Sequence, residues 1–281
     1  MNIQIFIFLE EYLCTGQGIK MKNYRLDVFL HNKGYVGSRE KAKELILNNS
    51  VFVDDKLITK PSYMVNDDVK IKITEDVYIS RGYLKIEKAI HVFNINIENK
   101  TAVDIGASTG GFTDYLLKHG VKKVYAIDVG CGQLHDSLKN DIRVVNLENT
   151  NFRYIDTSII TDIIDIITVD VSFISLQHII PKIVELSHND TDIVALVKPQ
   201  FEAGKVNIGK KGIVKKREVH LGVLNSINNY CKTNNLKLIN MDYSPIRGGA
   251  GNIEYLAHLK ITGNTNEINF KDLINKAFEK L

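Results

Sequence analysis

Hydrophobic and polar positions follow different patterns in the two parts of this chain. After about residue 81, short apolar runs alternate with stretches of helical periodicity. Such runs are typical of strands in a parallel sheet that is buried on both faces. We therefore predict an α/β unit in this part of the chain, with strands over residues 101–105, 123–127, 142–146, 163–169 and 192–197.

The last two apolar segments predict an antiparallel pair. Residues 236–243 and 254–261 are separated by an irregular, glycine-rich segment, which suits a hairpin. Together with the five earlier runs they give seven strands, so we expect a doubly wound, Rossmann-like sheet whose last strand is antiparallel. Residues 265–281 are predicted to form a C-terminal helix.

The part before residue 81 has shorter elements and predicts a small α+β domain over residues 21–80. Ser38 is a suitable N-cap for a helix in which Ala42, Leu45 and Ile46 share one face. Two aspartates form a turn between two short strands. The predicted elements are helices near residues 26–30 and 39–47 and strands at 51–53, 56–58 and 69–73.

Composition limits the class of protein only weakly. Hydrophobic residues make up 44% of the chain and charged residues 25%, as in ordinary globular proteins. The net charge of +3 is mild, so nucleic-acid binding has to be argued from local clusters of charge.

The N-terminus and the cysteines argue against a membrane anchor, a metal site and a disulfide framework. The apolar run at residues 3–9 is far shorter than the roughly 20 residues of a membrane span, and no basic segment precedes it. We interpret residues 1–20 as a non-essential extension. Cys14, Cys131 and Cys231 are odd in number and lack metal-ligand spacing, which favours a reducing cytoplasm and no bound metal.

A glycine-rich loop between the first strand and a helix at residues 112–119 is the strongest sign of a ligand. Glycines allow close approach of the backbone, and the helix N-terminus offers free N–H groups. Dinucleotide sites share this geometry, but the GxGxxG spacing is absent here. Asp104 precedes the glycines, where it suits the charged amino group of S-adenosylmethionine.

Asp128 ends the second strand, where it is placed to accept hydrogen bonds from ribose hydroxyls. Both aspartates lie at carboxyl ends of strands, where open α/β sheets bind ligands, although helix caps or loop acids are the alternative. Asn146 falls where an adenine-contacting loop is expected, and Asn149 and Asn151 fit capping roles equally well. The candidate cofactor residues are Asp104, Gly106, Ala107, Ser108, Thr109, Gly110, Gly111, Phe112, Asp128 and Asn146.

Four charged residues lie next to the predicted strands: Lys85, Asp170, Lys198 and Glu254. Methyl transfer to a ribose hydroxyl needs a base, groups that orient the hydroxyl, and in-line approach to the methyl group. A lysine serves as base only if its pKa falls, which a second cation and burial favour and a nearby acid opposes. For each residue alone, a surface salt bridge is the alternative, but all four at one edge of a sheet indicate a catalytic site.

The order SRGYLK, DIGASTGGFTD, VDVSFISL, VKPQFE and GNIEYL resembles the TlyA (haemolysin A) family of rRNA 2′-O-methyltransferases, whose catalytic domain is FtsJ-like. The resemblance implies an S-adenosylmethionine-dependent methyltransferase fold over residues 81–264. It also implies that the four charged residues form the catalytic tetrad, with Lys198 as the base, and that cytidines in 16S or 23S ribosomal RNA are the substrate. The chain departs from the family pattern in its N-terminal extension and at Tyr83-Leu84.

The N-terminal segments RLDVFL, SREKAKELI, VFVDDK and DDVKI resemble the S4-like RNA-binding domain. A second basic region, residues 198–217, holds seven basic residues, one acid and three glycines, which predicts a mobile loop suited to a phosphate backbone. Solvated surface charge is the alternative for both regions. The candidate RNA-binding residues are Arg25, Arg39, Lys41, Lys43, Arg81, Lys205, Lys210 and Lys211.

Three other functions compete with this prediction. A pseudouridine synthase could share the N-terminal module, but it needs no cofactor loop. A membrane-active haemolysin should show long amphipathic or apolar stretches, for which residues 3–9 are the single candidate. A binding protein that has lost its activity would not need the four charged residues.

Overall fold

The computed structural model describes residues 23–47, 50–74 and 79–281. The predicted extension at residues 1–20, with Cys14, lies outside these ranges. The chain divides into two compact units, residues 1–77 and 78–281. Each unit is described by itself.

In its described residues, 23–47 and 50–74, the first unit contains two helices and two small antiparallel sheets. Strands β2, β3 and β5 form one sheet in the order β3-β2-β5, and β1 pairs with β4. The predicted Ser38 cap is present, because its hydroxyl oxygen accepts a hydrogen bond from the Lys41 backbone N–H at 3.1 Å. The elements are β1 (Tyr24–Arg25), α1 (Leu26–Asn32), α2 (Arg39–Leu47), β2 (Val51–Val53), β3 (Lys56–Leu57), β4 (Met64–Val65) and β5 (Ile71–Ile73).

The second unit is an α/β fold around one seven-stranded sheet. Its helices are α3 (Gly82–Phe93), α4 (Gly111–Lys118), α5 (Asp136–Lys139), α6 (Ile180–Leu186), α7 (Pro199–Glu202), α8 (Arg217–Thr233) and α9 (Phe270–Lys280). Short 3-10 turns are η1 (Phe152–Tyr154), η2 (Thr157–Ile159), η3 (Leu176–His178) and η4 (Lys205–Asn207). Its strands are β6 (Thr101–Ile105), β7 (Lys123–Ile127), β8 (Val144–Leu147), β9 (Ile166–Val169), β10 (Asp192–Val197), β11 (Lys237–Tyr243) and β12 (Tyr255–Lys260).

The predicted sheet is confirmed, including its antiparallel last strand. The strand order is β11-β12-β10-β9-β6-β7-β8, and β12 runs antiparallel to both of its neighbours. Strands β8 and β9 begin later than predicted. Ile142 and Ile163, which begin the predicted runs, are 100% and 77% exposed, so they are loop residues and not part of the buried strands.

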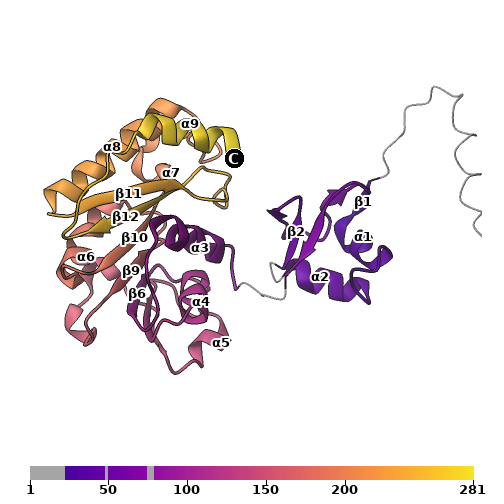
Figure 1. Cartoon of the computed structure of the whole chain (residues 1–281), viewed down its shortest axis with the longest axis horizontal. Coiled ribbons are helices and arrows are strands. Elements are labelled where there is room, and N and C mark those ends of the chain that lie inside the picture. Colours follow the sequence, from indigo (N-terminus) through magenta and orange to yellow (C-terminus); the bar gives the residue numbers. More distant parts are fainter. Residues whose placement is uncertain (1–22, 48–49, 75–78) are drawn as a thin grey trace, which may run out of the picture. The chain divides into compact units, whose positions relative to one another are not determined.

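Helices cover both faces of the sheet. Figure 1 shows α8 and α9 along one side of β11 and β12, and α3 and α4 on the other side. All five side chains of β6 are buried, which explains its continuous apolar run apart from Asp104. Helix α3 was not predicted, although its buried residues Tyr83, Ile86, Ala89, Ile90 and Phe93 have helical spacing.

Candidate active site

The sheet register brings three of the four predicted catalytic residues to one edge. Asp170 directly follows β9 and Lys198 directly follows β10, and these two strands are parallel neighbours. Glu254 directly precedes β12, which is antiparallel to β10 and pairs Tyr255 with Val197. The start of β12 therefore lies beside the end of β10. The carboxyl edge of a sheet is where open α/β folds bind their ligands.

Lys85 joins this cluster from the first turn of α3. Its Nζ atom lies 2.8 Å from Oε2 of Glu254 and 3.8 Å from Oδ2 of Asp170. Nζ of Lys198 lies 2.5 Å from Oδ1 of Asp170. The four side chains form one charged tetrad in which Asp170 contacts both lysines.

The tetrad is largely buried, so its charges interact strongly. Lys85 and Lys198 are each 8% exposed, and Glu254 is 2% exposed. Burial by itself lowers the pKa of the Lys85 ammonium, but the carboxylates of Asp170 and Glu254 outweigh burial, so its pKa is raised. Lys85 is therefore the cation that balances the two acids, and it stays protonated at neutral pH.

Residues outside the tetrad hold its members in place. The Gln200 side-chain amide donates a hydrogen bond to Oε1 of Glu254 at 3.2 Å, and Lys198 donates one to the Ser172 hydroxyl at 2.9 Å. A Cβ atom on Gly248 would lie 2.2 Å from Oε1 of Glu254. Gly248 is therefore required for the close approach of its loop to this carboxylate. None of these three supporting residues was predicted from the sequence.

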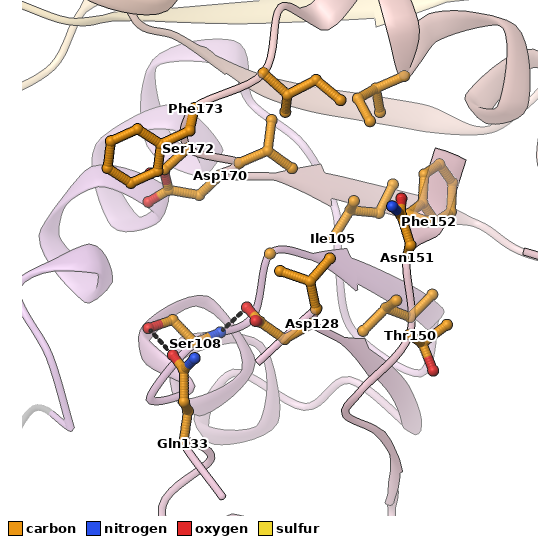
Figure 2. A pocket seen from close by; sticks show the side chains of 16 residues that line it. Ile105, Ser108, Asp128, Gln133, Thr150, Asn151, Phe152, Asp170, Ser172 and Phe173 are labelled. Atoms are coloured by element: carbon orange, nitrogen blue, oxygen red, sulfur yellow. Dashed lines mark hydrogen bonds between the residues drawn. The ribbon is translucent and has the colours of Figure 1, made fainter. Parts of the chain in front are cut away.

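A cavity of about 440 Å³ adjoins the tetrad at Asp170. It extends between the loops that follow β6, β7, β8 and β9. Figure 2 shows Ser108 and Asp128 on one side of it and Asp170, Ser172 and Phe173 across from them. Ile105, Ile127, Phe152 and Ile179 line its apolar part. A Cβ atom on Gly106, whose φ is +84°, would lie 2.6 Å from the Asp170 carbonyl oxygen. This glycine therefore allows the loop after β6 to pack against the loop after β9.

Of the two aspartates proposed to contact the cofactor, Asp128 lines the cavity and Asp104 does not. The Asp128 carboxylate accepts hydrogen bonds from the backbone N–H groups of Ser108, at 2.8 Å, and Gly130, at 2.7 Å, which fix it at the cavity wall.

Asp104 is fully buried in β6, where Thr113 donates two hydrogen bonds to its carboxylate and Thr168 donates one. The expectation that Asp104 contacts the amino group of a ligand is corrected, because its oxygens face protein donors. Asp104 instead ties the strand to helix α4.

The predicted adenine contact at Asn146 is also corrected. Its side chain is exposed outside the cavity lining and donates a hydrogen bond to Glu148 at 3.0 Å. Glu148 accepts further hydrogen bonds from the backbone of Gln133 and Leu134, so it shapes the loop at residues 131–135. The hydrogen bond from Asn146 is the largest cause of a lowered pKa at Glu148, which together with the backbone hydrogen bonds falls to about 2. Thr150, Asn151 and Phe152 occupy the cavity wall instead, and Asn151 also caps η1.

Other members of the predicted cofactor set surround the cavity unevenly. Gly106 and Ser108 line it, whereas Gly110 and Gly111 allow close packing against Leu138 and Ser80. Ala107 and Phe112 are buried, and Thr109 accepts a backbone hydrogen bond from His135. The loop thus serves partly as the wall of the cavity and partly as the support behind it.

Phe173 is a site residue that sequence reasoning missed. Its side chain is 91% exposed, it lines the cavity, and its φ of +64° is rare for a bulky residue. The ring lies beside that of Phe201, with centroids 5.0 Å apart. A strained backbone that exposes an aromatic ring beside a buried charged site indicates a functional role. The sequence signal was an aromatic residue three positions after Asp170, the residue that directly follows β9.

The FtsJ-like methyltransferase family matches residues 78–261, and the S4 domain family matches residues 25–71. The chain belongs to the FtsJ-like methyltransferase family. A putative rRNA methyltransferase of Bacillus subtilis is 43% identical over 88% of this chain and 89% of that protein. The 16S/23S rRNA (cytidine-2′-O)-methyltransferase TlyA of Mycobacterium tuberculosis is 38% identical over 84% of this chain and 89% of that protein. The predicted resemblance to the TlyA (haemolysin A) family is confirmed.

A solved structure, a putative hemolysin from Streptococcus thermophilus, is similar over 92% of this chain and 97% of that chain, with a TM-score of 0.71 and 39% identity. Within the described ranges, no helix is long and apolar enough to cross a membrane. In the same residues, no cluster of three or more histidine, cysteine or acidic side chains is placed to hold a metal ion.

The predicted RNA-binding residues fall into two groups, one in each unit. In the S4 domain, Arg25 and Arg39 both donate to the buried carboxylate of Asp27, at 3.0 and 2.9 Å, so their guanidinium groups are held in fixed positions. Lys41 is exposed and pairs with Glu44. In the FtsJ-like domain, Lys205, Lys210 and Lys211 are exposed, and Arg81 donates to the Arg247 carbonyl oxygen at 3.0 Å.

We predict that Asp104→Asn changes the pH dependence of stability. Burial, the largest effect, raises the pKa of Asp104 from 3.8 to about 6. The folded state therefore holds this proton more tightly than the unfolded state, and the resulting stability is lost as the pH rises through about 6. Asparagine resembles the protonated form. The free energy of unfolding of the variant should gain about 3 kcal/mol relative to wild type between pH 4 and 7, from two pKa units at about 1.4 kcal/mol each.

Urea unfolding at several pH values measures this difference, and Asp190→Asn, at an exposed carboxylate, is the control. Parallel stability curves for Asp104→Asn and wild type would contradict the assignment.

We also predict that Gly248→Ala lowers methyl transfer by about 10- to 100-fold, because the new methyl group displaces the Glu254 carboxylate from Lys85. Gly249→Ala is the matched control, because no atom lies within 4 Å of a Cβ at that position. Turnover and thermal unfolding of both variants are compared with wild type. Equal turnover of the two variants would show that the position of Glu254 does not limit the reaction.

Proposed function

We propose that this chain transfers a methyl group from S-adenosylmethionine to the ribose 2′-hydroxyl of a cytidine in ribosomal RNA. The observation that carries the proposal is the buried tetrad of Lys85, Asp170, Lys198 and Glu254 at the end of the cavity. The substrate is supported by the TlyA methyltransferase of Mycobacterium tuberculosis, which is similar over most of its length, and by the S4 domain match.

The residues that line the cavity suit the chemical groups of S-adenosylmethionine. Asp128 is placed to accept hydrogen bonds from the two ribose hydroxyls, and Ile127, Phe152 and Ile179 offer apolar contact for the adenine. Gly106, with no side chain, and Asp170 lie at the other end, toward the tetrad. When bound there, the cofactor supplies an electrophilic methyl group.

Within the tetrad, the residues take different roles. Glu254 and Asp170 keep Lys85 protonated, so Lys85 is suited to orient the substrate hydroxyl as a hydrogen-bond donor. Lys198 is the proposed base, which accepts the hydroxyl proton at its Nζ atom. Its contacts to Asp170 and Ser172 fix the position of that atom.

Phe173 offers a platform for the base of the target nucleotide. Enzymes that act on a nucleotide within a structured nucleic acid take it out of the stack and hold its base against aromatic side chains. Phe173 is exposed next to Ser172, whose hydroxyl accepts a hydrogen bond from Lys198, the proposed general base. Ring stacking there would hold the ribose near the tetrad.

The competing functions receive less support. The methyltransferase family match over residues 78–261 leaves no unit for pseudouridine synthase chemistry in that part of the chain. The hemolysin name of the Streptococcus thermophilus structure describes that protein, and no membrane-spanning helix is found among the residues described here.

Mapping of 2′-O-methyl groups in ribosomal RNA from cells with and without this chain tests the proposal. A cytidine that loses its 2′-O-methyl group when the gene is removed, and regains it with the purified protein and S-adenosylmethionine, is the expected result. An unchanged methylation map together with no transfer in vitro would overturn it.

We predict that Lys198→Met lowers the turnover number by about 10²- to 10⁴-fold, the usual contribution of a general base. Methionine fills the buried space without a proton acceptor. Cofactor affinity, measured by calorimetry, should be unchanged. Lys88→Met is the matched control, because Lys88 is another partly buried lysine with an acidic partner, Asp242, outside the tetrad. Turnover of Lys198→Met near that of wild type would exclude Lys198 as the base.

For the S4 domain, we predict that replacing Lys41 and Lys43 with alanine weakens RNA binding and leaves cofactor binding unchanged. Both lysines lie on α2, and each phosphate contact that is lost should lower the slope of log affinity against log salt by about one. Filter binding at several salt concentrations measures the slope. An unchanged slope would show that α2 does not contact the RNA backbone.

A further inference from the structure

The tight turn at residues 209–213 carries two of the lysines predicted to contact RNA. The Gly209 backbone N–H donates to the Ile213 carbonyl oxygen at 3.1 Å, and the Gly212 N–H donates to the Gly209 carbonyl at 2.8 Å. Lys210 and Lys211 lie exposed at the tip of this turn. We call residues 204–216 the basic loop.

The base of the turn is bonded to a buried asparagine beside the tetrad. Asn252 is 1% exposed and comes two residues before Glu254. Its side-chain amide donates to the Gly212 carbonyl oxygen at 2.8 Å, and its side-chain oxygen accepts from the Val214 N–H at 2.9 Å. One side chain thus makes a two-point bridge to the backbone of the basic loop.

A second chain of buried contacts reaches Val214 of the basic loop. The Val214 carbonyl oxygen lies 3.0 Å from Nε2 of His220, and Nδ1 of His220 lies 2.8 Å from the hydroxyl of Tyr255. A carbonyl oxygen can only accept, so Nε2 carries the hydrogen of His220, and Nδ1 accepts from the Tyr255 hydroxyl. Burial lowers the pKa of His220, which favours this neutral form.

Both contacts therefore start from residues that flank Glu254 in the chain. Asn252 binds the backbone N–H of Val214, and Tyr255 acts through His220 on its carbonyl group. Because Glu254 is itself bonded to Lys85, movement of Val214 relative to the tetrad would break buried hydrogen bonds. A buried polar group that loses its partner is costly, which makes this connection stiff.

We propose that Asn252 and the Tyr255–His220 pair are positioning residues that hold the lysines of the basic loop at a fixed place relative to the catalytic tetrad. This inference rests on the proposed RNA methyltransferase function. The residues that it names take no part in the proposed methyl transfer itself. A fixed pair of cations at the tip of the turn contacts a phosphate without first being ordered, so RNA affinity gains from the tether.

The test compares Asn252→Asp, which keeps the size of the side chain and removes the donor to Gly212, with Tyr255→Phe, which removes the hydroxyl that serves His220. Each should raise KM for the RNA substrate by about tenfold, the range for loss of one buried hydrogen bond, and leave cofactor affinity unchanged. Trypsin should cleave after Lys205, Lys210 or Lys211 faster in both variants than in wild type. Asn234→Ala is the control, because Asn234 also donates to a backbone carbonyl, that of Tyr230, at the end of α8.

A double-mutant cycle separates this role from general damage. In a background where Lys210 and Lys211 are both alanine, Asn252→Asp should raise KM far less than it does in wild type, because the tether has lost the groups that it positions. The inference would be overturned if Asn252→Asp raised KM by the same factor in both backgrounds, or if trypsin cleaved the variants no faster than wild type. A loss of cofactor affinity as large as the rise in KM would also overturn it. The cleavage assay needs no activity, so a wild-type protein that methylates no RNA would refute the proposed function alone.

Discussion

Lys85 and Glu254 are 169 positions apart in the chain, and their side chains meet at 2.8 Å in a largely buried site. Removal of charges from water is costly, and the cost is recovered only when partners with good geometry surround each charge. Asp170 and Lys198 complete the set, so two lysine side chains lie against two acidic side chains. These ion pairs connect four segments of the chain: the loops after β9 and β10, the start of β12 and the first turn of α3.

The direction of β12 makes this arrangement possible. In a sheet of parallel strands, residues that follow the strands gather at one edge. A strand that runs the other way contributes to that edge the residue that precedes it, which is Glu254 here. The same reversal places Asn252 and Tyr255 on either side of Glu254, where they reach the basic loop. One topological feature thus serves both the proposed chemistry and the proposed substrate contact.

Asp104 in β6 and Asp128 directly after β7 show how burial gives similar residues different roles. Asp128 lies at the surface of the cavity, where backbone N–H groups hold it and ligand hydroxyls can reach it. Asp104 has no exposed surface, and its partners are the hydroxyls of two threonines and one backbone N–H. Both follow an apolar run in the sequence. Their different environments depend on whether the side chain points to the loop edge or into the layer between β6 and α4.

The sequence by itself determined the seven strands of the second unit and their α/β alternation, because buried parallel strands leave apolar runs with polar residues at their ends. It also singled out Lys85, Asp170, Lys198 and Glu254, but only the resemblance to the TlyA family implied that they form one catalytic tetrad, and Lys85 lies on α3, which was not predicted. It did not determine β1 and β4, each of two residues, which are too short to show a period. Only the tertiary structure decided that Asp104 and Asn146 lie outside the lining of the cavity, that Phe173 lines it, that Gly248 packs against Glu254, and that Asn252 is hydrogen-bonded to Val214. Those roles depend on contacts between segments far apart in the chain, and local periodicity carries no information about such contacts.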